Sequence, residues 1–257
     1  MNLLHEVDIK NAIRDFSPDV VIHAAAYTAV DNAEDNEELA RKINVDATRY
    51  IAEACKKEGS KLIYISTDYV FDGTKDLSET YEVTDLTNPK SVYGLTKLEG
   101  EKAAFTNPNT FVVRTSWVFG INGKNFVKTM LKLGETRDEI NVVSDQYGSP
   151  TYTVDLAKLI VDMSDTNKYG LYHANNEGFC NWAEFAEEIF KSNDMNVKVN
   201  HITSDMYPQK ANRPKNSKLS KKSLDDAGFD RLPDWHEALV RYNKELKNTK
   251  SKVLTLN

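Results

Sequence analysis

Apolar residues recur along the chain at two spacings, one typical of helices and one of buried strands, and the two alternate. Residues 2–16 carry apolar side chains near helical spacing, and Ser17-Pro18 ends that segment. Residues 19–26 are mostly apolar and do not alternate with polar positions, which indicates a strand buried on both faces. Similar runs at 61–66 and 110–115 are separated by helical patterns at 37–57 and 92–105. This alternation predicts βαβ units, and therefore an α/β fold with a parallel sheet.

The second half of the chain has a looser rhythm. Helices are predicted at 125–133, 154–163 and 235–246, and strands at 140–143 and 196–202, with a turn-rich segment at 145–151. Asn181, followed three residues later by Glu184, has the spacing of a capping box at the start of another helix. We expect this half to form a smaller lobe over the C-terminal edge of the sheet, where open α/β sheets bind ligands.

The amino-acid composition argues against several classes of binding partner. A net charge of -6 and the lack of a basic stripe argue against nucleic acid and against a membrane surface. The apolar runs are too short to cross a bilayer, and residues 1–20 contain no signal-peptide core. Cys55 and Cys180 are interpreted as reduced thiols of a cytoplasmic protein, and no acidic, His or Cys residues have metal-site spacing, so we predict no metal site.

Tyr93-Gly-Leu-Thr-Lys97 is the strongest chemical signal. A tyrosine and a lysine four residues apart lie on the same face of a helix. The lysine cation favours the phenolate form and so lowers the pKa of the tyrosine. Such a tyrosine can serve as a general acid or base. The alternative is an ordinary surface pair, since the pattern alone is common. Thr67, at the end of a predicted strand, adds a hydroxyl that can bond a substrate carbonyl, although strand-end turns are also rich in such residues.

Seven sequence blocks carry a resemblance to a known family. The chain resembles the extended short-chain dehydrogenase/reductases over nearly its whole length, and the dTDP-4-dehydrorhamnose reductases in particular. The blocks are Ala24-Ala-Ala-Tyr-Thr-Ala-Val-Asp31, Ser66-Thr-Asp-Tyr-Val-Phe71, Tyr93-Gly-Leu-Thr-Lys-Leu-Glu-Gly-Glu101, Arg114-Thr-Ser-Trp117, Asn125-Phe-Val-Lys-Thr-Met130, Asp145-Gln-Tyr-Gly-Ser-Pro-Thr151 and Arg213-Pro214.

The resemblance implies a Rossmann-like, doubly wound parallel sheet and NADPH- or NADH-dependent reduction of dTDP-4-dehydro-6-deoxy-L-mannose to dTDP-L-rhamnose. Tyr93 would donate the proton to the sugar C4 carbonyl, Lys97 would tune Tyr93 and hold the nicotinamide ribose, and Thr67 would orient the carbonyl. Asp68 and Trp117 would contact the sugar, although Trp117 could also be a core residue. Further implied positions are Ala25, Ala26, Tyr27 and Thr28 for the cofactor, Gln146 and Arg213 for the nucleotide, and Asn44 as support for the site.

Two of these implied roles have simpler alternatives: Gln146 could be a turn residue, and Asn44 a helix-surface amide. The resemblance places residues 1–118, with 148–175, in an incomplete dinucleotide-binding domain, and 119–147 with 176–257 in the substrate-binding lobe. The implied partner is a dTDP-linked 4-keto-6-deoxyhexose, in a cytoplasmic protein without nucleic-acid or membrane partners. The choice between NADH and NADPH, metal dependence and a homodimer are left open.

One departure from the family concerns the cofactor. Family members begin with a strand and Gly-x-x-Gly-x-x-Gly, whose backbone amides approach the cofactor pyrophosphate, whereas this chain has no glycine before Gly59. We therefore expect the first βαβ unit to be absent, the strand at 20–25 to have an unpaired edge, and dinucleotide binding to be weak. A fragment of a longer reading frame is the favoured interpretation. An inactive shortened homologue, a non-catalytic binding or regulatory subunit, and a nucleotide-sugar epimerase or dehydratase are the alternatives.

Overall fold

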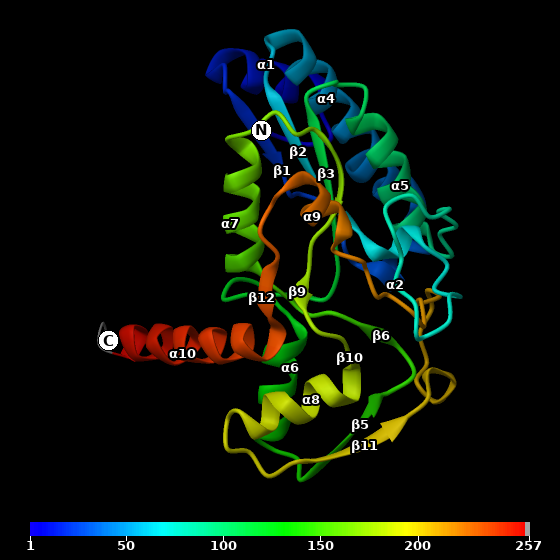
Figure 1. Ribbon diagram of the computed structural model, residues 1–257, viewed down its shortest axis with the longest axis vertical. Coiled ribbons are helices and arrows are strands. Elements are labelled where there is room, and N and C mark those ends of the chain that lie inside the picture. Colours follow the sequence, from blue (N-terminus) through cyan, green and yellow to red (C-terminus); the bar gives the residue numbers. More distant parts are fainter. Residues whose placement is uncertain (255–257) are drawn as a thin grey trace.

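The computed structural model describes residues 1–254, with side chains through residue 249 (Figure 1). The helices are α1 (Glu6–Phe16), α2 (Val30–Ala33), α3 (Glu37–Arg41), α4 (Ala47–Glu58), α5 (Val92–Ala104), α6 (Phe126–Gly134), α7 (Thr153–Ser164), α8 (Trp182–Lys191), α9 (Lys222–Ala227) and α10 (Trp235–Leu254). A π-helical turn, η1 (Lys42–Asp46), joins α3 to α4, and η2 (Asp68–Val70) and η3 (Ser204–Met206) are 3-10 turns.

The strands fall into one main sheet and several short pairs. They are β1 (Val20–His23), β2 (Lys61–Thr67), β3 (Thr110–Thr115), β4 (Val118–Phe119), β5 (Glu139–Val143), β6 (Tyr147–Gly148), β7 (Thr151–Tyr152), β8 (Gly170–His173), β9 (Asn176–Glu177), β10 (Cys180–Asn181), β11 (Lys198–Ile202) and β12 (Leu232–Asp234). The main sheet has the order β1-β2-β3-β8, and all its neighbours are parallel. The predicted α/β fold with a parallel sheet is therefore confirmed.

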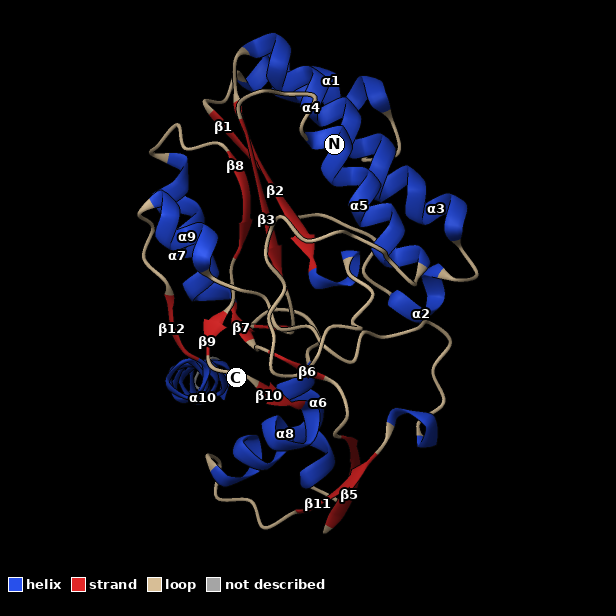
Figure 2. Cartoon of the chain, turned by 45° about the vertical axis from the view of Figure 1, so that its right-hand side comes forward, coloured by secondary structure: helices blue, strands red, loops and turns tan. Residues whose placement is uncertain are grey.

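Helices cover both faces of the main sheet, as a doubly wound fold requires (Figure 2). Successive residues of β2 point to opposite faces: Leu62 and Tyr64 pack with α1 and α4, whereas Ile63 packs with α7. These strand residues are fully buried, because apolar helices lie on both sides. Leu224 and Phe229 also pack on the α7 face, although their positions fall within the range predicted for the lobe.

A second apolar cluster, formed mainly by α6, α8, α10 and the pair β5–β11 and called the lobe below, lies below the main sheet in the view of Figure 1. Helix α8 packs on α6 and on the parallel pair β5–β11, and α10 contributes Leu239 and Tyr242. The capping box at the start of α8 is present, with Asn181 and Glu184 bonding each other's backbone amides. The predicted lobe residues 255–257 lie outside the described residues.

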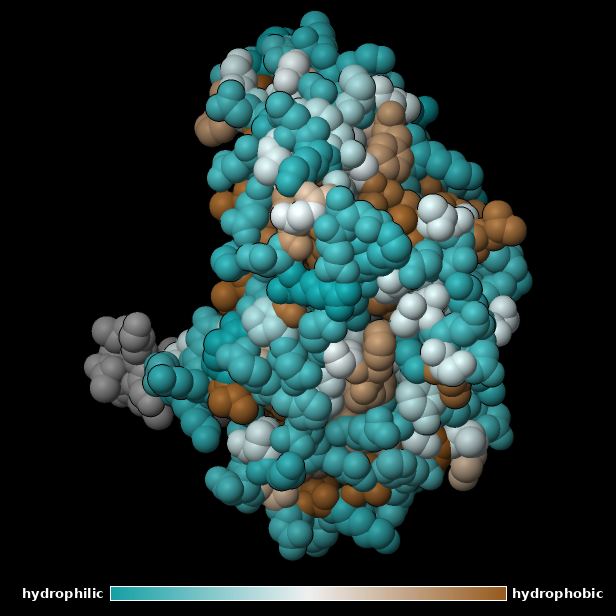
Figure 3. All heavy atoms as spheres, in the orientation of Figure 1, coloured by the Kyte–Doolittle hydropathy of each residue, from teal (hydrophilic) through white to brown (hydrophobic). Residues whose placement is uncertain are grey.

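Strand β1 lies at one end of the main sheet. It pairs with β2 on one side, and within residues 1–254 no strand pairs with its other side. Ile22 in this strand is 51% exposed, so the edge is apolar as well as unpaired, in line with the expectation from the sequence. In Figure 3, the face seen in the view of Figure 1 is otherwise largely hydrophilic, with apolar residues in small patches. None of the helices in the described part of the chain is long and apolar enough to cross a bilayer.

Candidate functional site

A cavity of about 540 Å³ lies where β1, β2 and β3 end, and it is called the strand-end cavity below. Helix α5 supplies polar side chains to it, α7 supplies an apolar wall, and the start of α8 reaches it from the lobe. The lining residues are Ala24, Ala26, Thr28, Val30, Ile65, Ser66, Thr67, Asp68, Tyr69, Tyr93, Lys97, Thr115, Ser116, Trp117, Val118, Thr153, Leu156, Ala157, Ile160 and Trp182. The cavity thus brings together Thr67, Tyr93 and Lys97.

Tyr93 and Thr67 form the polar centre of this cavity. Ser91 caps α5 through the Gly94 N–H, so Tyr93 lies in the first turn, close to the end of β2. Gly94 lets the helix approach η2, since a Cβ there would collide with the Tyr69 carbonyl oxygen. Burial raises the pKa of the Tyr93 phenol above its usual value, and the hydrogen bond with Thr67 only partly offsets this. At neutral pH the phenol therefore holds its proton.

Lys97 lies in the cavity wall with its ammonium group against the backbone of β2 and an aromatic ring. Its Nζ donates to the Ile65 carbonyl at 2.6 Å and lies 4.0 Å from the centre of the Tyr64 ring. Burial lowers the pKa of Lys97 to about 7, against the raising effect of Glu101. The expected lowering of the Tyr93 pKa by this cation is replaced by a rise, because burial dominates and the ammonium is directed to a backbone carbonyl.

Asp68 is a buried acid beside the hydroxyl of Thr67. Thr67 Oγ1 donates to Asp68 Oδ1 at 3.0 Å, and Ser217 Oγ donates to Asp68 Oδ2. Only 3% of Asp68 is exposed, and burial raises its pKa to about 6 despite these two hydrogen bonds. An acid in this state changes its charge just below neutral pH, which is a frequent property of functional sites.

Asn44, in the π-helical turn η1, links the segment after β1 to helix α5, and both of these elements contribute residues to the cavity. Its Oδ1 accepts from the Tyr27 N–H at 2.8 Å, and its Nδ2 donates to Thr96 Oγ1 at 3.0 Å. The side chain is buried, so the alternative of a helix-surface amide is wrong. Asn44 therefore fixes the backbone after β1 relative to α5. Tyr27 itself and Ala25 are not among the lining residues, whereas Ala26 and Thr28 are.

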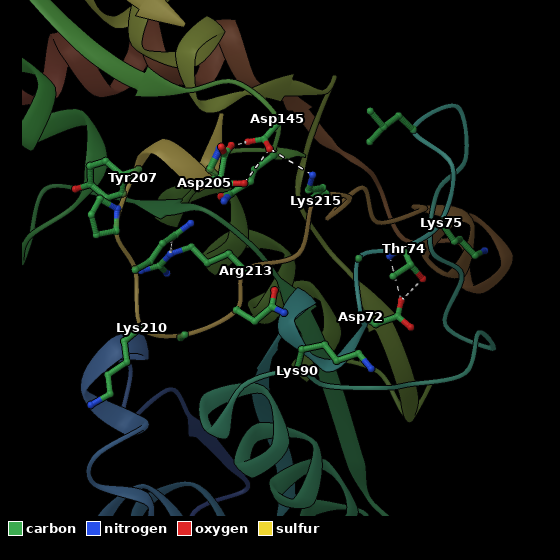
Figure 4. Close-up of a pocket in the computed structure, with 18 of the residues that line it drawn as sticks. Asp72, Thr74, Lys75, Lys90, Asp145, Asp205, Tyr207, Lys210, Arg213 and Lys215 are labelled. Atoms are coloured by element: carbon green, nitrogen blue, oxygen red, sulfur yellow. Dashed lines mark hydrogen bonds and ion pairs between the residues drawn. The ribbon is translucent and has the colours of Figure 1, made fainter. Parts of the chain in front are cut away.

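A second cavity, of about 910 Å³, is lined by charged residues and is called the charged cavity below (Figure 4). Figure 4 shows Tyr207 and Lys210 on one side of it, Asp72, Thr74 and Lys75 on the other, and Arg213 between them. The lining cations are Lys75, Lys90, Lys210, Arg213 and Lys215, and the lining carboxylates are Asp72, Asp76, Asp145 and Asp205. The structure thus places Gln146 and Arg213 here and not in the strand-end cavity.

Arg213 lies between the two cavities. Its guanidinium donates to Asp31 Oδ2 at 2.5 Å and to the Tyr69 hydroxyl at 3.2 Å, and Tyr69 lines the strand-end cavity. The ring of Tyr69 packs edge-on against Tyr93, with 5.5 Å between centroids. Among the described cations that line the charged cavity, Lys90 is the one without an ion pair, and it is exposed.

Trp182 was not predicted as a site residue. It is the first residue of α8, and its ring stacks on Trp117 with 3.7 Å between centroids. The capping box predicts where α8 begins, but a sequence pattern cannot show that its first side chain reaches a cavity formed by the sheet. The apolar wall from α7, which includes Leu156 and Ile160, was missed for the same reason.

Comparison with known proteins gives consistent matches. Residues 1–248 match the family described as the RmlD substrate binding domain. The spore coat polysaccharide biosynthesis protein SpsK of Bacillus subtilis (strain 168) is 39% identical over 246 residues, covering 95% of this chain and 86% of that protein. A dTDP-4-dehydrorhamnose reductase of Aggregatibacter actinomycetemcomitans is 42% identical over 253 residues, covering 91% and 85%.

A solved structure is equally similar. The crystal structure of dTDP-4-dehydrorhamnose reductase from Bacillus anthracis str. Ames, in complex with NADP, has a TM-score of 0.93 at 40% identity. The match covers 95% of this chain and 87% of that one.

Proposed function

The chain belongs to the family of the RmlD substrate binding domain, and from this membership we propose that it reduces the 4-keto group of dTDP-4-dehydro-6-deoxy-L-mannose to give dTDP-L-rhamnose. The observation that carries the proposal is the convergence of Thr67, Tyr93 and Lys97 on one cavity at the carboxyl ends of parallel strands. In open α/β sheets this is the place where ligands bind.

The residues of the strand-end cavity fit the nicotinamide end of a dinucleotide. Ala26, Thr28 and the apolar side chains of α7 line this part of the cavity and suit a nicotinamide ring, and the buried Lys97 is proposed to hold a ribose hydroxyl. A reduced nicotinamide, when bound, supplies the hydride that the reduction requires. For the pyrophosphate end, this sequence contains no Gly-x-x-Gly-x-x-Gly. NADPH and NADH both remain candidates.

The proposed roles of the polar residues follow from their protonation. Tyr93 holds a proton on its hydroxyl at neutral pH and is placed to give it to the C4 oxygen as negative charge develops there. The Thr67 hydroxyl, which lies in the same cavity as Tyr93, orients the same oxygen. Asp68 and Trp117 contact the sugar, and Asn44 positions the backbone at Tyr27.

The charged cavity is proposed to hold the nucleotide part of the substrate. Arg213 lies at its boundary with the strand-end cavity, Gln146 lines it, and a guanidinium suits a diphosphate. The exposed Lys90 adds a cation that has no ion-pair partner among the described residues. A ligand that spans both cavities would then place its sugar beside Tyr93.

We also propose which parts of the chain bind the cofactor and which bind the substrate. Residues 1–118 with 148–175 are assigned to cofactor binding, and 119–147 with 176–257 to the substrate. We propose a cytoplasmic protein, with a homodimer as the oligomeric state to be tested by light scattering.

Product analysis tests the proposed reaction. The chain is incubated with dTDP-4-dehydro-6-deoxy-L-mannose and millimolar NADPH or NADH, and the sugar nucleotides are identified by NMR. We expect dTDP-L-rhamnose to appear in step with oxidation of the reduced nicotinamide. An epimerised or dehydrated sugar, formed without net oxidation of NADPH or NADH, would instead identify an epimerase or dehydratase. If no sugar is converted and a pull-down recovers a stable complex with another protein, the chain is a binding subunit.

A further inference from the structure

Two of the three tryptophans in the chain stack on each other in the wall of the strand-end cavity. Trp117 follows β3, whereas Trp182 begins α8, in the part of the molecule drawn below the sheet in Figure 1. Their rings lie nearly parallel, at an interplanar angle of 14°. Phe126 of α6 packs against Trp182, with 4.6 Å between centroids. The lobe therefore contributes an aromatic surface to the cavity that holds Tyr93.

The backbone at Trp117 has an unfavourable conformation. Its φ of 51° lies in the left-handed region, which is rare for a bulky residue and indicates strain. Gly148 leaves room for the indole, since a Cβ at that position would lie 2.9 Å from Trp117 Cε2. The Thr151 N–H donates to the Trp117 carbonyl at 3.2 Å and fixes the turn.

Trp182 is held just as firmly on its own helix. The Asn181–Glu184 capping box fixes the first turn of α8, of which Trp182 is the first residue. Phe185, one turn later, is fully buried in the lobe core and anchors that turn. The capping box and Phe185 thus hold the first turn of α8 in place, and with it the Trp182 side chain. A rigid aromatic ring with part of its surface on a cavity is suited to select a ligand by shape.

We propose that Trp182 is a specificity-determining residue that, together with Trp117, forms the aromatic wall for the apolar, methyl-bearing side of a 6-deoxyhexose. The inference rests on the proposed function and extends it to a residue on the lobe. The polar groups of the cavity, Thr67, Asp68 and Tyr93, come from β2, η2 and α5 and serve the carbonyl and hydroxyls of the sugar. The 6-methyl group is the part of such a sugar that gains from an indole surface and loses when a hydroxyl is added.

A matched pair of ligands measures this preference without any cofactor. L-rhamnose is 6-deoxy-L-mannose, so dTDP-L-rhamnose and dTDP-L-mannose differ only in the hydroxyl at C6. Binding of both sugars and of dTDP to the chain is measured by isothermal titration calorimetry. We expect the wild-type chain to bind dTDP-L-rhamnose about tenfold or more tighter than dTDP-L-mannose, the low end of what one group in an apolar pocket provides.

Three variants distinguish an effect of the aromatic wall on sugar binding from a general effect of changing the lobe. Trp182→Ala should bring the two sugar affinities to within about twofold of each other while the dTDP affinity stays within about twofold of wild type, and Trp182→Phe should keep most of the preference. Trp235→Phe is the matched control, because Trp235 is buried in the lobe and is not among the residues lining the cavity. It should keep the full preference.

The Trp235→Phe variant also gives a readout that does not depend on how well Trp182→Ala folds. Trp117 and Trp182 are then the only tryptophans, and their fluorescence should change with dTDP-L-rhamnose but not with dTDP. Three results would overturn the inference about Trp182 without affecting the proposed function. They are an unchanged sugar preference in Trp182→Ala, an equal loss of preference in Trp235→Phe, and fluorescence that does not change when dTDP-L-rhamnose binds. Failure of the wild-type chain to bind any dTDP compound would overturn the proposed substrate class as well.

Discussion

Burial controls the ionisation of the polar side chains at the strand-end cavity. The sequence indicated Tyr93, Lys97 and Thr67 correctly as neighbours of one cavity, because their spacing on a helix and their place at a strand end are local features. It could not predict the direction of the Tyr93 pKa shift, which depends on how much of the protein surrounds the phenol. A raised pKa keeps the proton on the phenol at neutral pH, which suits the proposed role of Tyr93 as a proton donor, whereas the expected lowering of this pKa by Lys97 is not found.

Asp68 gives the clearest pH-dependent prediction at this scale. Its pKa of about 6 in the folded protein lies above the ordinary 3.8, so the folded state binds the proton more tightly and stability falls as pH rises between these values. The destabilisation is complete above pH 6 and absent below about pH 4. Asp68→Asn should therefore raise the free energy of unfolding at pH 8 by on the order of 2 kcal/mol, and by much less at pH 4.5. Urea denaturation at both pH values measures this, and an equal effect at both would contradict it.

At the scale of elements, the strands β1, β2 and β3 of the main sheet and the helices between them were predictable, whereas its fourth strand and the irregular elements were not. The strand predicted at 110–115 matches β3, because six buried residues in a row leave a clear apolar run. The partner strand β8 was missed because it begins at Gly170 and has only Leu171 and Tyr172 as apolar residues, too few for a recognisable apolar run. The helix predicted over 37–57 is present but contains the π-helical turn η1, which places Asn44 and which apolar periodicity does not reveal.

Asn44 should be important for stability because it satisfies groups on two other segments. Replacing it with alanine leaves the Tyr27 N–H without its partner and should lower the free energy of unfolding by about 1–3 kcal/mol. Asn36→Ala is a suitable control, since Asn36 is exposed and makes one local bond to the Asn32 carbonyl. Its effect should stay within about 0.5 kcal/mol. Equal effects of the two substitutions in denaturant melts would mean that Asn44 does not support the site.

At the scale of the whole molecule, the site depends on packing between the sheet and the lobe. Thr67 and Tyr93 come from the sheet and its helix, Trp182 comes from the lobe, and Arg213 lies between the two cavities. Family resemblance predicted the polar residues that line the strand-end cavity. Trp182 could not be predicted from local patterns, because its position depends on how α8 is placed relative to β3.

Cofactor affinity is a property of the whole chain and can be measured directly. The sequence contains no glycine-rich turn to bring backbone amides to a pyrophosphate, so we expect NADPH and NADH to bind weakly, in the millimolar range, on the order of a thousandfold weaker than a micromolar site. Titration of each dinucleotide, followed by quenching of tryptophan fluorescence, tests this. Micromolar affinity would mean that other residues of the chain replace the glycine turn.

Turnover by Tyr93→Phe tests the central claim, that the Tyr93 hydroxyl donates the proton to a sugar ketone, most directly. The substitution removes one oxygen atom and leaves the ring packed against Tyr69. With wild-type and variant chains at the same millimolar NADPH, the rate of dTDP-L-rhamnose formation should fall by about 10²–10⁴-fold, while the affinity for dTDP-L-rhamnose stays within about threefold. A variant that forms product at the wild-type rate would contradict the account.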